Sequence, residues 1–418
     1  MTSSTVAPAR DAYAIALDEI DLVDPMLFHR NEHWAYFKRL REEDPVHYTP
    51  RSRYGPFWSI TRYQDILAVN NNHRAFSSLG VINLDQNIMK GQTDDAIPVG
   101  GFLALDPPAH DERRKTVTPA VAPRNLVRLE GMIRERTRGV LAELPIGAEF
   151  DWVEAVSLKL TMLMLATLLD FPPDQQPRLK RWSDIITGSP GDGNVESWEQ
   201  RDSELAEMGQ AFLDLREQRR HQDPAPDIIS MLAHSAAAAD MTPIEYISDI
   251  SLLIVGGNDT TRNTMSGSIV AFDQHPAEWT KLMADPKLLD GAVPEMIRWQ
   301  TPVLYQGRRA MQDQDIGGKT IRKGDMVAMW YISGNRDETA IVDPDRFIID
   351  RERPRQHLSF GFGIHRCLGN RLAEMQLRVL WEEIIEMGWK RIEVVSPPIY
   401  AISNLLRAIE QLPVRIHA

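Results

Sequence analysis

Cysteine is almost absent from this chain of 418 residues, which contains only Cys367. A single thiol excludes any disulfide within the chain. The amino-terminal residues 1–24 are polar and mixed in charge, and they lack the apolar core of a secretion signal. We therefore expect a protein that works in the reducing environment of the cytoplasm.

Long apolar runs and an excess of positive charge are also missing. The most apolar segment, 160–169, is interrupted by Thr161 and Thr167, and it is far shorter than the roughly 20 residues that cross a bilayer. The formal net charge of −12 argues against a nucleic-acid partner, because phosphate binding needs a positive surface. Hydrophobic residues make up 43% of the chain, enough for a large core. These features predict a globular protein that binds small molecules and has no membrane span.

Helical periodicity dominates the sequence, with apolar residues three and four positions apart. The predicted helices cover 132–144, 154–169, 198–222, 243–273, 286–299 and 367–389. Strand patterns occur only near 57–61 and 305–329, where Gly317-Gly318 and Lys323-Gly324 are typical of hairpin turns. Neither a repeat nor a long low-complexity linker divides the chain. We predict a mainly α fold with small β-sheets, formed by one domain over residues 24–418 after an N-terminal extension of residues 1–23.

Cys367 lies in a glycine-rich segment, 357–370, directly before a predicted helix. At a helix start, unpaired backbone N–H groups and the helix dipole stabilise a thiolate. Gly361, Gly363 and Gly369 allow the backbone to fold tightly around that sulfur, a geometry that suits a metal ligand. Two other interpretations exist. A lone buried cysteine is commonly an apolar filler, and His365-x-Cys367 offers two of the four ligands of a structural zinc site.

The spacing Phe360-x-x-Gly363-x-x-x-Cys367-x-Gly369 resembles the haem-ligand signature of the cytochrome P450 family, the haem-thiolate monooxygenases. The resemblance implies a single-domain α-helical prism with haem b (iron protoporphyrin IX) between a long central helix and the helix after Cys367. It makes Cys367 the iron ligand. It also implies oxidation chemistry, in which a thiolate opposite the oxygen site favours O–O cleavage and one atom of O2 enters an unactivated C–H bond.

Glu295 and Arg298 lie one turn apart on a predicted helix. Such pairs are common on protein surfaces, but this one resembles the family's buried Glu-x-x-Arg. That pair would bond with an arginine such as Arg346 and brace the haem-binding core. We assign it no catalytic role.

Gly256-Gly257 and Asp259-Thr260 lie in the middle of the helix predicted over 243–273. A glycine there costs roughly 1 kcal/mol relative to alanine, which suggests a purpose. Without side chains, a flat cofactor and O2 can approach the backbone, and a threonine hydroxyl bonded to a carbonyl can open the helix. Asp259 and Thr260 resemble the family's acid–alcohol pair, which relays protons to oxygen. The alternative is a weak point in the helix with solvated polar residues.

Haem propionates need cationic or hydrogen-bonding partners, because carboxylates cannot be buried unpaired. By their positions, His110, Arg114, Arg308 and His365 resemble the family's propionate contacts. Outside that resemblance, each of them would be an ordinary surface cation or capping residue.

The sequence over 256–263, 297–302 and 356–366 resembles the bacterial branch that hydroxylates alkanes and fatty acids at the chain end. Since a terminal methyl C–H bond is stronger than those of its methylene neighbours, end hydroxylation needs a narrow apolar channel. The candidate wall residues, otherwise ordinary core, are Ile82, Leu84, Ile97, Val99, Leu253, Val303, Leu304 and Ile402. A steroid or terpene hydroxylase and a non-catalytic haem sensor are the alternatives.

The sequence contains no Gly-x-Gly-x-x-Gly motif after a strand, no Walker loop and no Gly-x-Ser-x-Gly elbow. The electrons must therefore come from another protein, which the resemblance identifies as a small acidic 2Fe–2S ferredoxin with a separate ferredoxin reductase. Arg113, Lys115, Arg366 and Arg371 would form a basic docking face near Cys367. Scattered solvated charge is the alternative.

Overall fold

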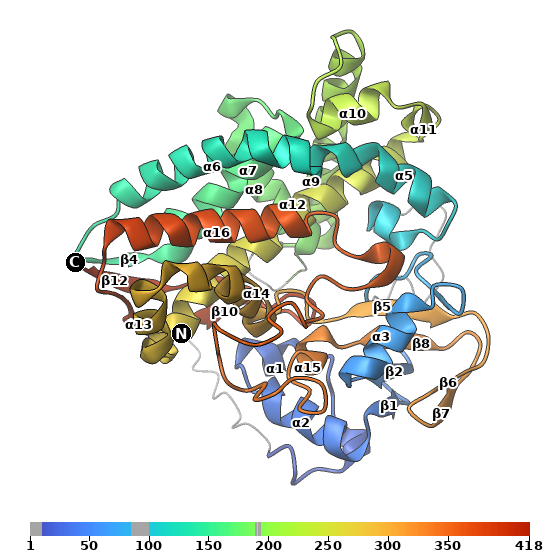
Figure 1. Cartoon of the computed structure of the whole chain (residues 1–418). Helices are drawn as coiled ribbons and strands as arrows, with labels where there is room; N and C mark the ends of the chain where they lie inside the picture. Colours follow the sequence, from blue (N-terminus) through green and yellow to red (C-terminus); the bar gives the residue numbers. More distant parts are fainter. Residues whose placement is uncertain (1–10, 85–99, 189, 191–193) are drawn as a thin grey trace.

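Helices dominate the structure, a computed structural model that describes residues 11–84, 100–188, 190 and 194–418 (Figure 1). The α-helices are α1 (Pro25–His29), α2 (His33–Glu43), α3 (Tyr63–Asn71), α5 (Ala109–Val117), α6 (Pro123–Ala142), α7 (Lys159–Leu169), α8 (Gln176–Thr187), α9 (Trp198–Arg220), α10 (Ile228–His234), α11 (Ala236–Ala239), α12 (Pro243–Gln274), α13 (Pro276–Ala284), α14 (Leu289–Gln300), α15 (Tyr331–Gly334) and α16 (Asn370–Met387). Shorter 3-10 or π-helical segments are η1 (Leu17–Glu19), η2 (Gly101–Ala104), η3 (Thr118–Val121), η4 (Val153–Leu158), η5 (Pro173–Gln175), η6 (Pro286–Leu288) and η7 (Gly363–His365).

The strands form small sheets beside the helices. They are β1 (Val46–Thr49), β2 (Phe57–Ile60), β3 (Phe76–Ser77), β4 (Glu149–Asp151), β5 (Gln306–Ala310), β6 (Gln314–Ile316), β7 (Lys319–Ile321), β8 (Met326–Met329), β9 (Arg391–Val394), β10 (Ile399–Tyr400), β11 (Ile409–Gln411) and β12 (Pro413–His417). The largest sheet has the order β1-β2-β8-β5-β3, a second has β4-β12-β9, and β6-β7 and β10-β11 form separate pairs. Only β2 and β8 pair in parallel among the described strands. The predicted mainly α fold with small β-sheets is confirmed.

The central helix α12 is fixed at its start and packed along its length. Thr242 and Glu245 form a capping box, and Pro243 occupies the first turn, where its missing N–H costs nothing. Ile254 packs into a core cluster with α6, α7 and α9, whereas Ile269 packs into a second cluster with α14 and α16. The polar stretch around Gly256 therefore lies between the two largest parts of the core.

Several predicted helix boundaries differ from the observed ones. The helix predicted over 132–144 starts earlier, with α6, and the helices predicted over 154–169 and 286–299 begin with the π-helical η4 and the 3-10 η6. The helix predicted from Cys367 begins only at Asn370. Cys367 thus stays in the loop, which bends from α16 toward α3 and β5 (Figure 1).

The prediction of a hairpin turn is confirmed at Gly317-Gly318 and wrong at Lys323-Gly324. Gly317 and Gly318 have φ of 55° and 79° and join the paired strands β6 and β7. Strand β7 does not pair with β8, which instead pairs with β5 and β2. The β6-β7 hairpin is therefore an excursion between the paired strands β5 and β8, and Gly324 returns the chain to Ala310 by a hydrogen bond of 2.8 Å.

The described part of the expected N-terminal extension, residues 11–23, packs against the rest of the chain. Ala12, Ile20 and Val23 are buried in one cluster with Phe28 and Trp330. Across the described residues, no helix combines the length and the apolarity that a bilayer crossing requires.

Candidate functional site

The loop that carries Cys367 folds back on itself. The Cys367 N–H donates to the Phe360 carbonyl oxygen at 2.8 Å, and the Gly369 N–H donates to the Cys367 sulfur. Gly361 and Gly363 have φ of 62° and 66°, in the left-handed region that favours glycine. Gly369 has ordinary backbone angles and acts as the N-cap of α16. Two of the three glycines therefore have the tight-folding role that the sequence predicts.

Asn70, at the end of α3, bonds to this loop. The sequence did not predict this role. Its side-chain oxygen accepts from the Phe362 N–H at 2.5 Å, and its amide nitrogen donates to the Tyr331 hydroxyl at 3.0 Å. A Cβ on Gly363 would lie 2.9 Å from the Asn70 carbonyl oxygen, so only glycine fits there. No motif marks Asn70, because its role depends on a partner almost 300 residues away.

The Cys367 side chain is accessible, yet protein atoms surround it. It is exposed, but burial is the main reason that its pKa is raised, while the Gly369 N–H, Arg114 and Arg366 act to lower that pKa. The sulfur is therefore open to an incoming group although nearby protein atoms desolvate it, and a bound cation would favour its thiolate form.

Gly256 and Gly257 keep the middle of α12 bare. No described atom of another element lies within 4 Å of the place that a Cβ on Gly256 would take, whereas Gly257 faces Leu165 at 3.5 Å. The Thr260 hydroxyl donates to the Gly256 carbonyl oxygen at 3.1 Å, the bond that the sequence predicts. α12 nevertheless remains helical throughout. The bond therefore orients the Thr260 hydroxyl without breaking the helix.

Asp259 is buried and faces α8. Its carboxylate accepts from Arg262 at 2.9 Å and from the Asn258 amide at 3.2 Å. Burial raises the pKa of Asp259 to about 6, with Asp184 adding to the rise and with Arg262 and Ser183 opposing it. Among the hydrogen bonds of the described residues, none joins Asp259 to the Thr260 side chain.

His110 and His365 lie side by side next to the cysteine loop. Their ring centroids are 4.4 Å apart in an edge-to-face arrangement. His110 Nδ1 lies 2.8 Å from the Asp111 carboxylate, and His365 Nε2 lies 2.9 Å from the Ser78 hydroxyl. Burial lowers the pKa of His365 to about 2, with Arg308 lowering it further, so this ring is neutral at physiological pH.

Arg308 and Arg114 approach the loop from different sides. Arg308 is buried on β5, where burial lowers its pKa. Arg114 on α5 donates to the Arg366 carbonyl oxygen at 2.5 Å, directly before Cys367. The structure thus brings all four predicted propionate contacts to the region of Cys367, with Arg114 bonded to the loop itself.

The free donors of this region fit an anionic, flat cofactor. Three buried polar atoms here lack a hydrogen-bond partner: His110 Nε2, His365 Nδ1 and Arg308 Nη2. Buried polar atoms normally have a hydrogen-bond partner, so three unpaired nitrogens in one region indicate a ligand. Cys367 supplies a thiolate for iron, Gly256 leaves room beside the helix, and the three nitrogens suit carboxylates. These residues therefore fit haem.

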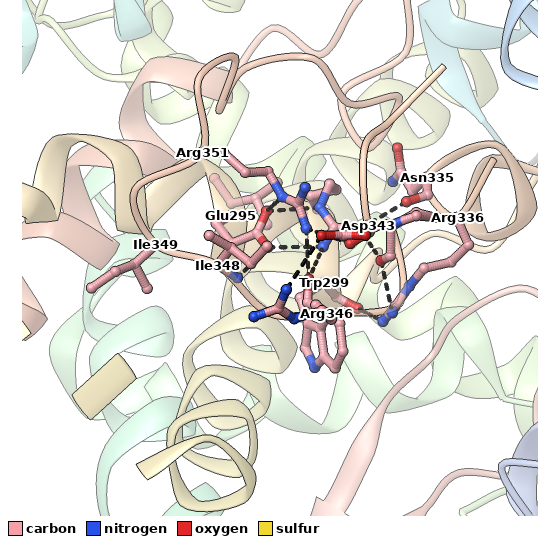
Figure 2. A network of polar contacts seen from close by, with 12 residues as sticks. Glu295, Trp299, Asn335, Arg336, Asp343, Arg346, Ile348, Ile349 and Arg351 are labelled. Carbon is pink, nitrogen blue, oxygen red and sulfur yellow. Dashed lines mark hydrogen bonds and ion pairs between the residues drawn. The ribbon is translucent and has the colours of Figure 1, made fainter. Parts of the chain in front are cut away.

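The Glu295–Arg298 pair is buried and bidentate. Figure 2 shows Glu295 within the surrounding network of polar contacts, with Arg351 beside it. Arg298 donates from two nitrogens to Glu295 at 2.7 and 2.8 Å, and both side chains are at most 1% exposed. The prediction that the Arg346 side chain completes this pair is wrong. Its side chain is exposed and pairs with Asp343, whereas Arg351 bonds to Glu295 at 3.0 Å. Arg346 contributes only its carbonyl oxygen, to Arg298 and Arg351.

The predicted substrate walls occupy three kinds of environment. Leu84 and Leu304 are buried in a core cluster with Tyr305, and Ile402 is exposed. Half-buried positions are occupied by Ile82, Leu253 and Val303. Ile97 and Val99 lie outside the described residues.

The predicted basic docking face loses one member. Arg113 is bonded to Glu245 and lies 3.8 Å from Asp249, both on α12, and only 13% of its side chain is exposed. It is therefore neutralised, and its inclusion in the face is wrong. Lys115, Arg366 and Arg371 are exposed as expected.

A zinc site at His365 and Cys367 would need further ligands. The described residues contain no group of three or more His, Cys, Asp or Glu side chains that could hold a metal ion. A single thiolate ligand to a cofactor iron needs no such group.

Comparisons with known proteins agree with this geometry. Residues 179–387 match the family described as Cytochrome P450. Linalool 8-monooxygenase from Pseudomonas putida is 38% identical over 95% of this chain and 99% of its own. Among solved structures, CYP153D17 from Sphingomonas sp. PAMC 26605 is 40% identical, with a TM-score of 0.90 over 96% of this chain and 100% of its own. Cytochrome P450-153 from Novosphingobium aromaticivorans is 36% identical, with a TM-score of 0.86 over 95% and 99%.

Proposed function

Because the chain belongs to the cytochrome P450 family of haem-thiolate monooxygenases, we propose that it hydroxylates the terminal carbon of a medium- or long-chain n-alkane or fatty acid. The reaction would use O2, haem b and two electrons from a 2Fe–2S ferredoxin. The observation that carries the proposal is the accessible Cys367 sulfur together with three unpaired donor nitrogens in the same region, on His110, His365 and Arg308.

The residues of the site divide into an iron ligand, propionate partners and a residue that supports the cysteine loop. Cys367 would hold the iron of the haem, while His110, His365 and Arg308 would bind its propionates. When bound, the haem supplies the O2-activating chemistry, and the cysteine thiolate favours O–O cleavage. Arg114 fixes the carbonyl before Cys367 and keeps positive charge near the thiolate.

Asp259 and Thr260 would deliver protons to the oxygen side of the site. The pKa of about 6 lets Asp259 hold or release a proton near neutral pH. Asp259 contacts Ser183 on α8, and the Thr260 hydroxyl donates to the Gly256 carbonyl oxygen, so the two residues would connect α8 with the oxygen side of the site. Since no direct bond joins the two side chains in the described structure, a bridging water would complete the path.

The substrate proposal rests on the similarity of the 256–263, 297–302 and 356–366 segments to the branch that oxidises alkanes and fatty acids. Ile82, Leu253 and Val303 are half-buried and apolar, so they can line a channel that presents only a chain end. Linalool 8-monooxygenase, which covers nearly the whole chain, favours a terpene hydroxylase as the second candidate.

Spin-state titration separates the two candidates, because a well-fitted substrate displaces water from the iron. We expect the largest spectral shift and the lowest dissociation constant with n-alkanes or fatty acids. A stronger response to linalool favours the terpene function, and a stronger response to steroids contradicts both. Binding without ferredoxin-dependent product formation would support a non-catalytic haem sensor.

Substitution of the proposed iron ligand tests the haem-thiolate assignment. The Cys367→Ser variant should lose the red-shifted band of the reduced carbon monoxide adduct, because a serine oxygen replaces the thiolate. Monooxygenation should fall to background. Retention of that band in the variant would contradict the assignment of Cys367.

A further inference from the structure

A cavity of about 230 Å³ lies where segments near both ends of the chain meet α12 and α14. Its lining includes Trp34, Trp299, Gln300, Arg336, Tyr400 and Arg407. Gly267, also in the lining, lies eleven residues after Gly256, which corresponds to about 16 Å along the helix axis. This two-arginine cavity is therefore distinct from the site around Cys367.

Tryptophan rings position the two guanidinium groups. The Arg336 guanidinium carbon lies 3.7 Å from the centre of the Trp299 ring and 4.6 Å from that of Trp34. The Arg407 carbon lies 5.1 Å from the same Trp34 ring. Figure 2 shows Arg336 close to Trp299. Both cations are thus fixed around one aromatic group.

The positive charge of this cavity is only partly balanced. Arg336 and Arg407 are 5% and 7% exposed. Among the described residues, Arg336 has one carboxylate within 4 Å, that of Asp345 at 3.7 Å, and the Asp345 side chain is 69% exposed. The buried Glu295 lies farther away and is already bonded to Arg298 and Arg351. Among the described residues no carboxylate oxygen lies within 4 Å of Arg407. Arg407 donates only to neutral oxygens, those of Asn31, Trp299 and Gln300. Since a buried cation without a nearby counter-charge is costly, the cavity favours an anion.

Unused N–H groups provide the contacts. The Nε atoms of Arg336 and Arg407 are buried and have no hydrogen-bond partner. Arg336 otherwise donates to two carbonyl oxygens, at 3.1 and 3.5 Å, out of five N–H groups. Gln274 and Asp345 are exposed at the rim, so a solute can enter.

We propose that the two-arginine cavity binds a small oxyanion, a carboxylate or a phosphate, between Arg336 and Arg407. Guanidinium groups bind both kinds of anion through paired N–H donors. The anion would link Trp34 near the start of the chain with Tyr400 and Arg407 near its end. Occupancy should therefore stabilise the folded protein.

Thermal unfolding of the full-length, haem-loaded protein tests the proposal. The protein is dialysed into chloride buffer and titrated with sodium phosphate or sodium benzoate at constant ionic strength. We expect a rise in Tm that saturates with at least one anion, and the anion effective at lower concentration identifies the ligand class. A response no larger than that to chloride with both anions overturns the proposal.

Two variants locate the effect. Gln274→Glu keeps both arginines and places a carboxylate at the rim, so the apparent affinity for the anion should fall at least tenfold. Arg407→Gln should abolish the saturable rise, although it can also lower the starting Tm. Arg322→Gln is the matched control, because Arg322 is exposed just after β7 and is not in the lining of the cavity. This variant should respond like the parent protein. An unchanged response in Gln274→Glu and Arg407→Gln contradicts binding in this cavity.

Discussion

The ionisation of Asp259 couples the proposed proton path to the stability of the fold. Its pKa of about 6 in the folded protein exceeds the ordinary value of 3.8, because burial disfavours the carboxylate. Between these two values the folded state binds a proton that the unfolded state releases. Stability from this residue is therefore greatest at low pH and is lost as pH rises through about 6.

The Asp259→Asn variant removes this dependence. The free energy of unfolding of the parent, relative to the variant, should be about 1 kcal/mol larger at pH 5 than at pH 7.5. Urea unfolding at the two pH values measures the difference. Asp249, whose pKa burial also raises to about 6, is present in both proteins and cancels. A difference that does not change with pH would mean that Asp259 has an ordinary pKa.

Individual site residues were predictable where a motif names them. Cys367, Gly363, His110, Arg308 and His365 are brought to one region, as the resemblance implied. Asn70 and Ser78, which hold the loop and His365, were not predicted. Each is a common polar residue whose role arises only when distant segments meet, so no local pattern reveals it.

At the scale of elements, the Glu295 network ties α14 to the segment before the cysteine loop. Glu295 accepts from Arg298, from Arg351 and from the Ile348 N–H, so a buried carboxylate is fully satisfied. Arg351 also donates to the carbonyl oxygens of Asp343 and Arg346. The network therefore fixes a loop that has no regular secondary structure of its own.

A matched pair of alanine variants distinguishes the two candidate arginines. Arg351→Ala should lower the free energy of unfolding by about 3 kcal/mol, because it leaves buried oxygens without donors. Arg346→Ala should change it by less than about 0.5 kcal/mol, because that side chain is exposed. Denaturant unfolding of the haem-loaded proteins gives both values. A larger loss of stability in Arg346→Ala than in Arg351→Ala would show that Arg346 is the partner of the Glu295–Arg298 pair.

The existence of elements was easier to predict than their ends and pairing. The predicted ends of α9 and α12 lie within two residues of the observed ones. The start of α16 was not predicted correctly, because glycine conformations and the hydrogen bonds of Cys367 keep the preceding residues out of the helix. The pairing of β8 with β5 and β2 depends on contacts between distant segments, which periodicity does not record.

At the scale of the whole molecule, a basic area remains on an acidic protein near the cysteine loop. Lys115, Arg366 and Arg371 are exposed, while the net charge is −12. A local positive field of this kind would orient an acidic ferredoxin toward Cys367. Arg113 takes no part, because Glu245 already neutralises it.

Charge reversal tests this docking face. Arg366→Glu should slow ferredoxin-dependent reduction about tenfold at low salt, with little effect on the dissociation constant of substrate. Raising the ionic strength should reduce the difference, because salt screens exposed charges. Stopped-flow reduction measures the rates, and Arg322→Glu, at an exposed position just after β7, is the control. Equal rates for Arg366→Glu and the parent would exclude this face.

The bare position at Gly256 makes the site sensitive to side-chain size. A Cβ there would meet no described protein neighbour, but it would enter the room that the proposed haem and O2 need. Alanine, valine and leucine at this position form a graded series of steric obstacles. Such a series would therefore measure how narrow the gap between the helix and the bound cofactor is, because each added carbon closes more of it.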